Sequence, residues 1–161
     1  MRTLLLAAVL LPQEVDNPEY GFWSACKKGS WVRVKMTIEQ DGKKHEVEQT
    51  STLVELTPGK AVVEQSGKTA EGKMPTQKRT IAAKQARPDP VEKEGEEDVE
   101  VGGKRLPCRW IELRKEEQGA RVWAKIWTSP EVPGGVVKSE IKPEGKGVGT
   151  IRVLVEAWEK K

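Results

Sequence analysis

The clearest alternation of apolar and polar residues lies at residues 31–39, WVRVKMTIE. The apolar positions there are Val32, Val34, Met36 and Ile38, and the intervening positions are Trp31, Arg33, Lys35 and Thr37. A period of two predicts a half-buried β-strand, because successive side chains of a strand point to opposite faces. Asp41-Gly42 follows, and both residues tolerate the positive φ of a tight hairpin. We therefore expect residues 45–56 to return antiparallel to this strand.

Further strand-like runs follow at similar spacing, and glycine or proline separates most of them. They are AVVEQ (61–65, flanked by Pro58-Gly59 and Ser66-Gly67), TQKRTIAAK (76–84), RLPCRWIELRKEEQ (105–118), RVWAKIWTS (121–129) and GTIRVLVEAWEK (149–160). No amphipathic helix pattern is found after the first residues. The pattern predicts an all-β or nearly all-β antiparallel meander that forms a curved sheet or partial barrel.

Two segments lack the strand pattern. Residues 15–30, VDNPEYGFWSACKKGS, are rich in turn-forming residues and are expected to wrap an edge of the fold. Residues 87–100, RPDPVEKEGEEDVE, are acidic and hold two prolines, which predicts an acidic loop or an excursion along an edge. At 161 residues the chain fits one domain, for which we expect residues 14–161.

The chain begins with MRTLLLAAVLL, a basic residue followed by an apolar run. This run has the length of the central region of a secretory signal and is too short to span a membrane. It predicts a signal peptide over residues 1–13 and a periplasmic or extracellular location. The alternative is an ordinary hydrophobic first strand.

The charged residues give no sign of a nucleic-acid partner. Lys and Arg number 28 and Asp and Glu 25, so the net charge is only +3 and is scattered. His45 is the single histidine, and the two cysteines lack the spacing of metal ligands. We therefore expect no catalytic constellation, no metal and no cofactor, and a protein that is not an enzyme.

Cys26 and Cys108 allow one pairing. In an oxidising compartment, a disulfide that closes so long a loop would contribute roughly 4 kcal/mol in the chain-entropy model. The alternative is two unpaired thiols, with Cys108 buried in a strand as a small hydrophobic residue.

The face of the sheet opposite the apolar positions carries tryptophan interleaved with cations. If the strands pair so that these positions meet, the face can bind an amphiphile, with indoles against its apolar part and cations near an anionic head. Alternatively, the Lys and Arg stems simply cover the indole rings. The candidate binding residues are Trp31, Arg33, Lys35, Trp123, Lys125, Trp127, Arg152 and Trp158, with Leu154 on the same face.

The stretch WTSPEVPGGVVKSE, residues 127–140, predicts a hairpin connection between two strands. Pro133 fits the second position of a type II turn and Gly134 the third, where φ is positive. The alternative is a flexible lip, in which Pro133, Gly134 and Gly135 let a ligand approach the backbone closely.

This stretch also carries a resemblance. Together with VEVGGKRLPCRWIEL, it is similar to a pattern in uncharacterised exported bacterial β-proteins, G-K-x-L-x-C followed by W-x-S-x-x-V-P-G-G-V-V-K, over roughly residues 96–140. Those proteins resemble in shape the periplasmic lipoprotein carriers (LolA-like half-barrels), whose curved sheet holds acyl chains on its concave side. The resemblance implies a non-catalytic exported protein that binds a lipid-like ligand. The alternative is a structural or protein-interaction module of the cell envelope.

Overall fold

The computed structural model describes residues 13–117, 119–145 and 149–161. Its elements in chain order are β1 (Glu14–Asp16), α1 (Pro18–Ser24), β2 (Trp31–Gln40), β3 (Lys43–Thr57), β4 (Lys60–Thr69), β5 (Gly72–Ala82), β6 (Lys84–Ala86), β7 (Lys93–Val101), β8 (Lys104–Glu117), β9 (Ala120–Thr128), β10 (Val136–Glu144) and β11 (Thr150–Glu159). The predicted signal peptide falls on residues 1–12, apart from Gln13, and so lies outside the described part. In the described ranges, no helix is long and apolar enough to cross a membrane.

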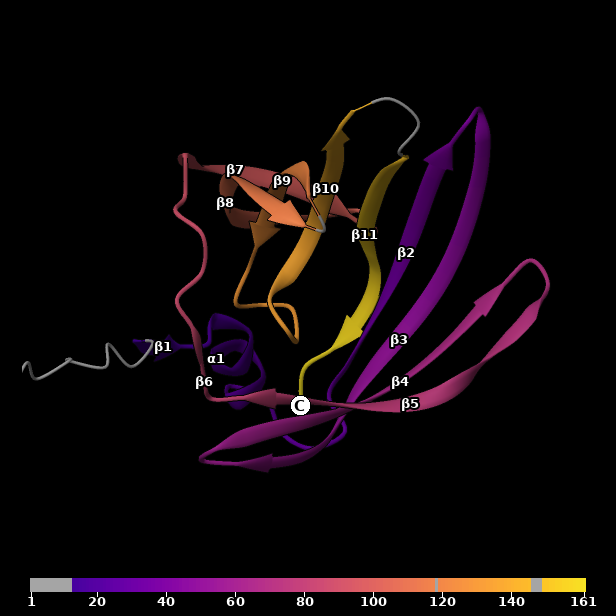
Figure 1. The fold of residues 1–161 in the computed structure, drawn as a ribbon. Helices are drawn as coiled ribbons and strands as arrows, with labels where there is room; N and C mark the ends of the chain where they lie inside the picture. Colours follow the sequence, from indigo (N-terminus) through magenta and orange to yellow (C-terminus); the bar gives the residue numbers. More distant parts are fainter. Residues whose placement is uncertain (1–12, 118, 146–148) are drawn as a thin grey trace, which may run out of the picture.

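Nine strands form one antiparallel sheet in the order β5-β4-β3-β2-β11-β10-β9-β8-β7. Each neighbour is also the next strand in sequence, except where β2 pairs with β11. Two meanders therefore meet in the middle of the sheet, as Figure 1 shows. The sheet curves, and within the described residues its two edge strands, β5 and β7, do not pair with each other. The predicted antiparallel curved sheet is therefore confirmed. β1 and β6 form a separate two-stranded ribbon.

The hairpin predicted at Asp41-Gly42 is present, with φ angles of 50° and 73° at these two residues. Pro58-Gly59 likewise lies between β3 and β4. The turn expected at Ser66-Gly67 is wrong, because β4 continues through it to Thr69. The register between β4 and β5 shifts at this point, so the serine and glycine mark an irregularity within a strand.

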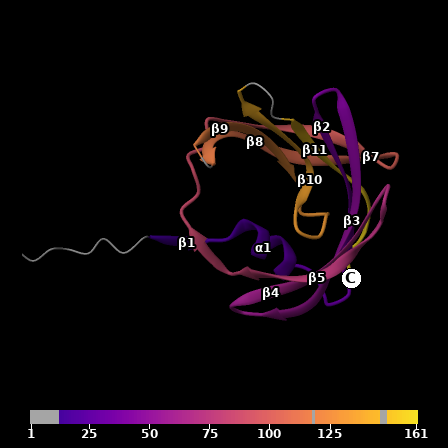
Figure 2. The same ribbon diagram turned by 45° about the vertical axis from the view of Figure 1, so that its right-hand side comes forward.

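A short helix, α1, lies in the segment expected only to wrap an edge. Asn17 caps it, since its side-chain oxygen accepts a hydrogen bond from the Glu19 amide at 3.0 Å, and Pro18 occupies the first turn. The strands curve around α1 (Figure 2). Glu19 pairs with Arg79 of β5, and the Tyr20 hydroxyl donates to the Thr57 carbonyl at 2.7 Å.

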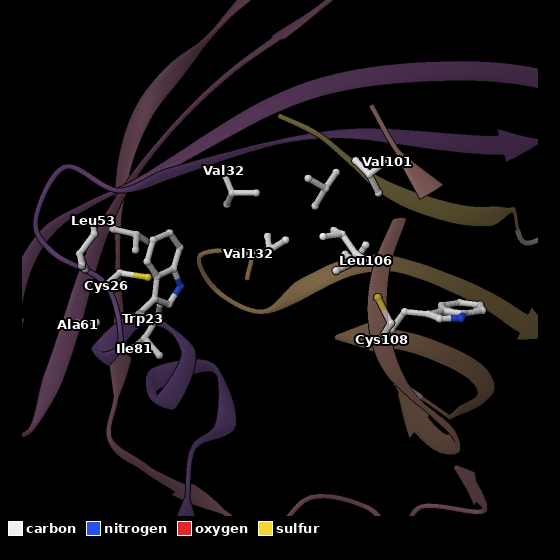
Figure 3. Close-up of a cluster of buried hydrophobic side chains, with 14 residues drawn as sticks. Trp23, Cys26, Val32, Leu53, Ala61, Ile81, Val101, Leu106, Cys108 and Val132 are labelled. Carbon is white, nitrogen blue, oxygen red and sulfur yellow. The ribbon is translucent and has the colours of Figure 1, made fainter. Parts of the chain in front are cut away.

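The core joins α1 to both meanders (Figure 3). Trp23 of α1 is 2% exposed, and Leu53 of β3 is fully buried. From the other meander come Leu106, near the β7–β8 turn, and Val155 of β11. The β7–β8 turn returns to β11, since a Cβ on Gly102 would lie 3.7 Å from the Glu156 carbonyl oxygen.

The acidic segment is mostly strand and only partly loop. Residues 93–101 form β7, which pairs with β8 from Lys93–Glu112 to Val101–Lys104. An edge strand tolerates such a sequence because charged side chains can reach solvent from both of its faces. The loop prediction holds only for the stretch before Lys93.

Candidate functional site

Register places most of the predicted binding residues on one face of the sheet. Residues directly opposite each other in an antiparallel pair point to the same side. One row across the strands runs Glu48, Lys35, Leu154, Lys138, Trp127, Trp110 and Gly95, and the next runs Glu46, Thr37, Arg152, Glu140, Lys125, Glu112 and Lys93. We refer to the face that carries these two rows as the indole–cation face. Trp31, Arg33 and Trp123 also lie on it.

Trp158 is the exception among the predicted residues. Glu156 is an extra residue in β11, so Val34 is opposite Val155 while Arg33 is opposite Ala157. The shift puts Trp158 opposite Val32 on the core face, where it packs against the core. The expectation that Trp158 accompanies Arg152 and Leu154 is therefore wrong.

The tryptophans near β9 are already covered. The Lys125 Nζ lies 4.0 Å from the Trp110 ring centroid and 4.7 Å from that of Trp127, and the Lys138 Nζ lies 4.5 Å from that of Trp127. The Trp127 Nε1 donates to the Glu97 carboxylate, and only 4% of Trp127 is exposed. These contacts match the alternative in which lysine stems cover the rings, and they leave Trp127 without an open surface for a ligand.

Trp110 also belongs to this cluster, although it was not among the predicted binding residues. Trp110 is on β8, directly opposite Trp127 of β9 on one side and Gly95 of β7 on the other. A Cβ at position 95 would be 2.5 Å from the Trp110 ring, so the ring occupies the space above that glycine. In the sequence of β8, Cys108 and Trp110 are separated by one residue, and this alternation is the signal that could have assigned Trp110 to the same face as the other indoles.

An open groove lies on the same face, over β2, β11 and β10. It has a volume of about 320 Å³, and Lys35, Lys44, Lys138 and Arg152 line it together with Thr37, Glu46, Val153, Leu154 and Glu156. Leu154 is 42% exposed and lies on the floor of this groove. The groove therefore combines an apolar floor with four cationic side chains and two carboxylates.

Glu46 holds two of these cations. The Lys35 Nζ is 3.0 Å and the Lys44 Nζ is 2.9 Å from its carboxylate oxygens. Hydrogen bonds from Lys44 and Lys35 lower the pKa of Glu46, and the bond to Glu46 raises the pKa of Lys35. Glu46 therefore stays ionised and occupies lysines that an anionic ligand would otherwise contact.

A second groove of about 420 Å³ continues from the first across β3 and β4. The two share Lys35, Lys44, Glu46 and Glu156. The second groove adds Lys68 and the carboxylate of Glu48, which are 3.2 Å apart. Together the two grooves extend across the face from β10 to β4.

The glycine pair lies in the connection between β9 and β10, so the predicted hairpin connection is present. Gly134 and Gly135 have φ angles of 77° and 81°. A Cβ on Gly134 would be 3.0 Å from the Trp23 ring, and one on Gly135 would be 2.1 Å from that of Phe22. The close approach thus serves α1, whose rings fill the space that the lip alternative assigned to a ligand.

Both cysteines are free and buried, and they lie at opposite ends of the core cluster (Figure 3). The disulfide alternative is therefore not formed, and the alternative of two unpaired thiols describes this structure. Burial raises the pKa of both thiols, which keeps them in the less reactive protonated form. In the described ranges, no group of three or more His, Cys, Asp and Glu residues is arranged to hold a metal ion.

Neither a family model nor a curated protein sequence matches the chain. Its fold resembles a candidate exported protein with a YmcC-like fold from Bacteroides fragilis, at a TM-score of 0.58 and 11% identity, over 84% of this chain and 98% of that one. It also resembles a candidate lipoprotein from Parabacteroides distasonis, at a TM-score of 0.57 and 10% identity, over 86% and 98%. The chain therefore shares its overall fold with these two proteins. The motif of residues 96–140 and the relation to lipoprotein carriers stay predictions.

Proposed function

We propose that the chain is an exported, non-catalytic protein of the cell envelope that binds an anionic, lipid-like amphiphile in the groove around Leu154. The observation that carries this proposal is the exposed Leu154 on the groove floor, with Lys35, Lys138 and Arg152 around it. The description of one structural neighbour as a candidate exported protein and of the other as a candidate lipoprotein supports the location.

The chemistry of the groove suits an acyl chain with an acidic head. Leu154 supplies apolar surface, whose burial is favourable at about 25 cal/mol per Å². Cations outnumber carboxylates in the lining, so an anionic head is attracted once the chain is in place. The volume of about 320 Å³ is at the lower end for small-molecule sites, which favours a single chain over a bulky lipid.

Two of the predicted residues, Lys35 and Arg152, take part directly in this proposal because they line the groove. Lys125 and Trp127 instead lie beside the groove, next to Lys138, whose Nζ lies over the Trp127 ring. The proposed site is therefore narrower than the predicted one, and its apolar contact comes from a leucine instead of the predicted indoles.

A fluorescence titration with a dansyl-labelled fatty acid tests the proposal, with the matching dansyl-labelled alcohol as a measure of anion preference. We expect the acid to bind more tightly than the alcohol. Leu154→Asn should weaken binding of the acid about tenfold, because the lost apolar contact is on the order of 1.4 kcal/mol. Leu56→Asn is the matched control, since Leu56 is 37% exposed and lies outside the groove.

The proposal fails if the parent chain does not bind the acid, or if both leucine variants weaken binding equally. A second candidate function, an interaction module of the cell envelope, is favoured by the free outer edges of β5 and β7. That function predicts no response to either probe.

A further inference from the structure

The two edge strands of the large sheet carry opposite charges. β5 holds Lys73, Lys78 and Arg79 and no acidic residue. β7 holds five acidic residues and one lysine, Lys93. Across the described part of the chain, no strand pairs with the outer side of either one. Two free edges of this length are templates for pairing with another chain.

On each edge strand, most of the charged side chains point to one face of the sheet. Lys73 is opposite Lys68, which is opposite Glu48, and Lys78 is opposite Glu64. Both lysines therefore lie on the indole–cation face. On β7 the acidic positions Glu94, Glu96, Asp98 and Glu100 recur every second residue and share the opposite face, because Gly95 and Glu97 are in line with Trp110 and Cys108 on the indole–cation face.

The topology decides how two such edges meet. All eight pairings in the nine-stranded sheet are antiparallel, so β5 and β7, at its two ends, run in the same direction. If β7 of one copy is placed antiparallel against β5 of another, the second copy must be turned over. Its acidic stripe then lies on the same side as Lys73 and Lys78. Antiparallel pairing, the more stable arrangement, thus brings opposite charges together across the junction.

We propose that the acidic edge β7 of one copy of this chain pairs antiparallel with the basic edge β5 of a second copy. Pairing of two β5 edges or two β7 edges would place like charges side by side, which is unfavourable. The contact is therefore head-to-tail, and the resulting pair of copies keeps one free edge of each kind, β5 on one copy and β7 on the other. Such a heterologous contact extends into a chain of copies unless the rotation closes a ring.

Part of each edge has a role within its own copy. Arg79 pairs with Glu19, and Glu94 with Arg109. The Asn17 side chain donates to the Ala82 carbonyl at 2.9 Å and so covers the end of β5. The charges that remain for the junction are Lys73 and Lys78 on one side and Glu96, Asp98 and Glu100 on the other.

Sedimentation velocity with two complementary variants tests the proposal. Lys73→Glu with Lys78→Glu blocks the basic edge, and Glu96→Lys with Asp98→Lys blocks the acidic edge. At about 0.01 M ionic strength, where the Debye length is about 30 Å, we expect the parent chain to form species larger than a dimer as its concentration rises. Each variant alone should be a monomer. Their equal mixture should again form species larger than a dimer, because the intact acidic edge of one variant meets the intact basic edge of the other, and the two reversed edges carry opposite charges as well.

The control Lys43→Glu makes the same kind of charge change in the β2–β3 hairpin and should assemble as the parent does. At about 1 M salt, where the Debye length is about 3 Å, assembly of the parent should weaken. A parent that stays monomeric at low ionic strength overturns the proposal, as does a variant mixture that stays monomeric while the parent assembles. Circular dichroism of each variant verifies the fold. None of the four substituted edge residues lines the grooves, so both variants should still bind the dansyl-labelled acid. Failure of assembly can therefore be told apart from failure of ligand binding.

Discussion

The two ends of the core region are covered in different ways. At α1, apolar and aromatic groups meet directly, with Trp23 and Phe22 against the glycines of the β9–β10 connection. On the indole–cation face, the long stems of Lys125 and Lys138 lie over Trp110 and Trp127. The first arrangement depends on a precise fit between rigid groups, whereas the second depends on flexible side chains that remain partly hydrated.

This difference predicts a different tolerance to substitution. A rigid contact has no room for an added atom, so even a methyl group is strongly unfavourable there. A lysine over an indole can move or be replaced by another long side chain with a modest loss. The three predictions that follow test this contrast in order of expected effect.

Gly135→Ala should have the largest effect. Its new Cβ would be 2.1 Å from the Phe22 ring, and alanine is strained at the φ of 81°. We expect the free energy of unfolding in urea to fall by about 3 kcal/mol, from overpacking of about 2 and a left-handed backbone cost of about 1. Gly42→Ala is the matched control, since its φ is 73° but nothing lies within 4 Å. It should lose only about 1 kcal/mol, and equal losses in the two variants would contradict the rigid contact.

Lys125→Met should have an intermediate effect. Methionine keeps an unbranched stem over the rings but removes the cation that lies over Trp110 and Trp127. We expect a loss of about 1 kcal/mol in thermal or urea unfolding, from two contacts of roughly 0.5 kcal/mol each. Lys142→Met, which affects one contact at 5.1 Å to Trp123, should lose about half as much. A loss as large as that of Gly135→Ala would show that this face is as rigid as the region around α1.

Glu46→Gln should have the smallest effect and one that depends on pH. The pKa of Glu46 is lowered in the folded chain, so its ion pairs stabilise the fold above the ordinary glutamate pKa of about 4.3 and lose that contribution as the pH falls through the lowered value. The unfolding midpoint of the parent should therefore fall more steeply below about pH 4.3 than that of the variant. If the unfolding midpoints of the two proteins fell in parallel as the pH is lowered, the stabilising role of the Glu46 ion pairs would be contradicted. At neutral pH, the variant should bind the dansyl-labelled acid more tightly than the parent, because Lys35 and Lys44 are released.

The strands of β2 and β3 could be predicted because the alternation of residues 31–39 and the Asp41-Gly42 turn are local signals. The helix α1 could not, since at seven residues it is stabilised by contacts of Trp23 with distant strands and not by its own periodicity. β7 was missed because its charges resemble those of a solvated loop, although Val99 and Val101 already alternate with Asp98 and Glu100.

The sequence predicts which cations share the face of the candidate site, but it does not predict that Leu154 forms the apolar floor. Alternation assigned Lys35, Lys125 and Arg152 to one face, which the register of the sheet reproduces. No local pattern announces the extra residue that moves Trp158 to the core face. Nor does the sequence reveal that Leu154 stays exposed while Trp127 is covered, because that depends on which strands are neighbours in the sheet.

The irregularity at Glu156 determines which face of the sheet the last residues of β11 point to. Beyond Glu156, the alternation of side chains between the two faces is shifted by one residue, and the backbone of Lys161 forms hydrogen bonds with Lys27 and Ser30. The pairings of Val155 with Val34 and of Ala157 with Arg33 need no residue between them, so deletion of Glu156 would make the strand regular and leave Trp158 on the core face. The length of β11 can thus change at this one position without moving an indole to water, and we expect a deletion to be tolerated better at Glu156 than at its regularly paired neighbours.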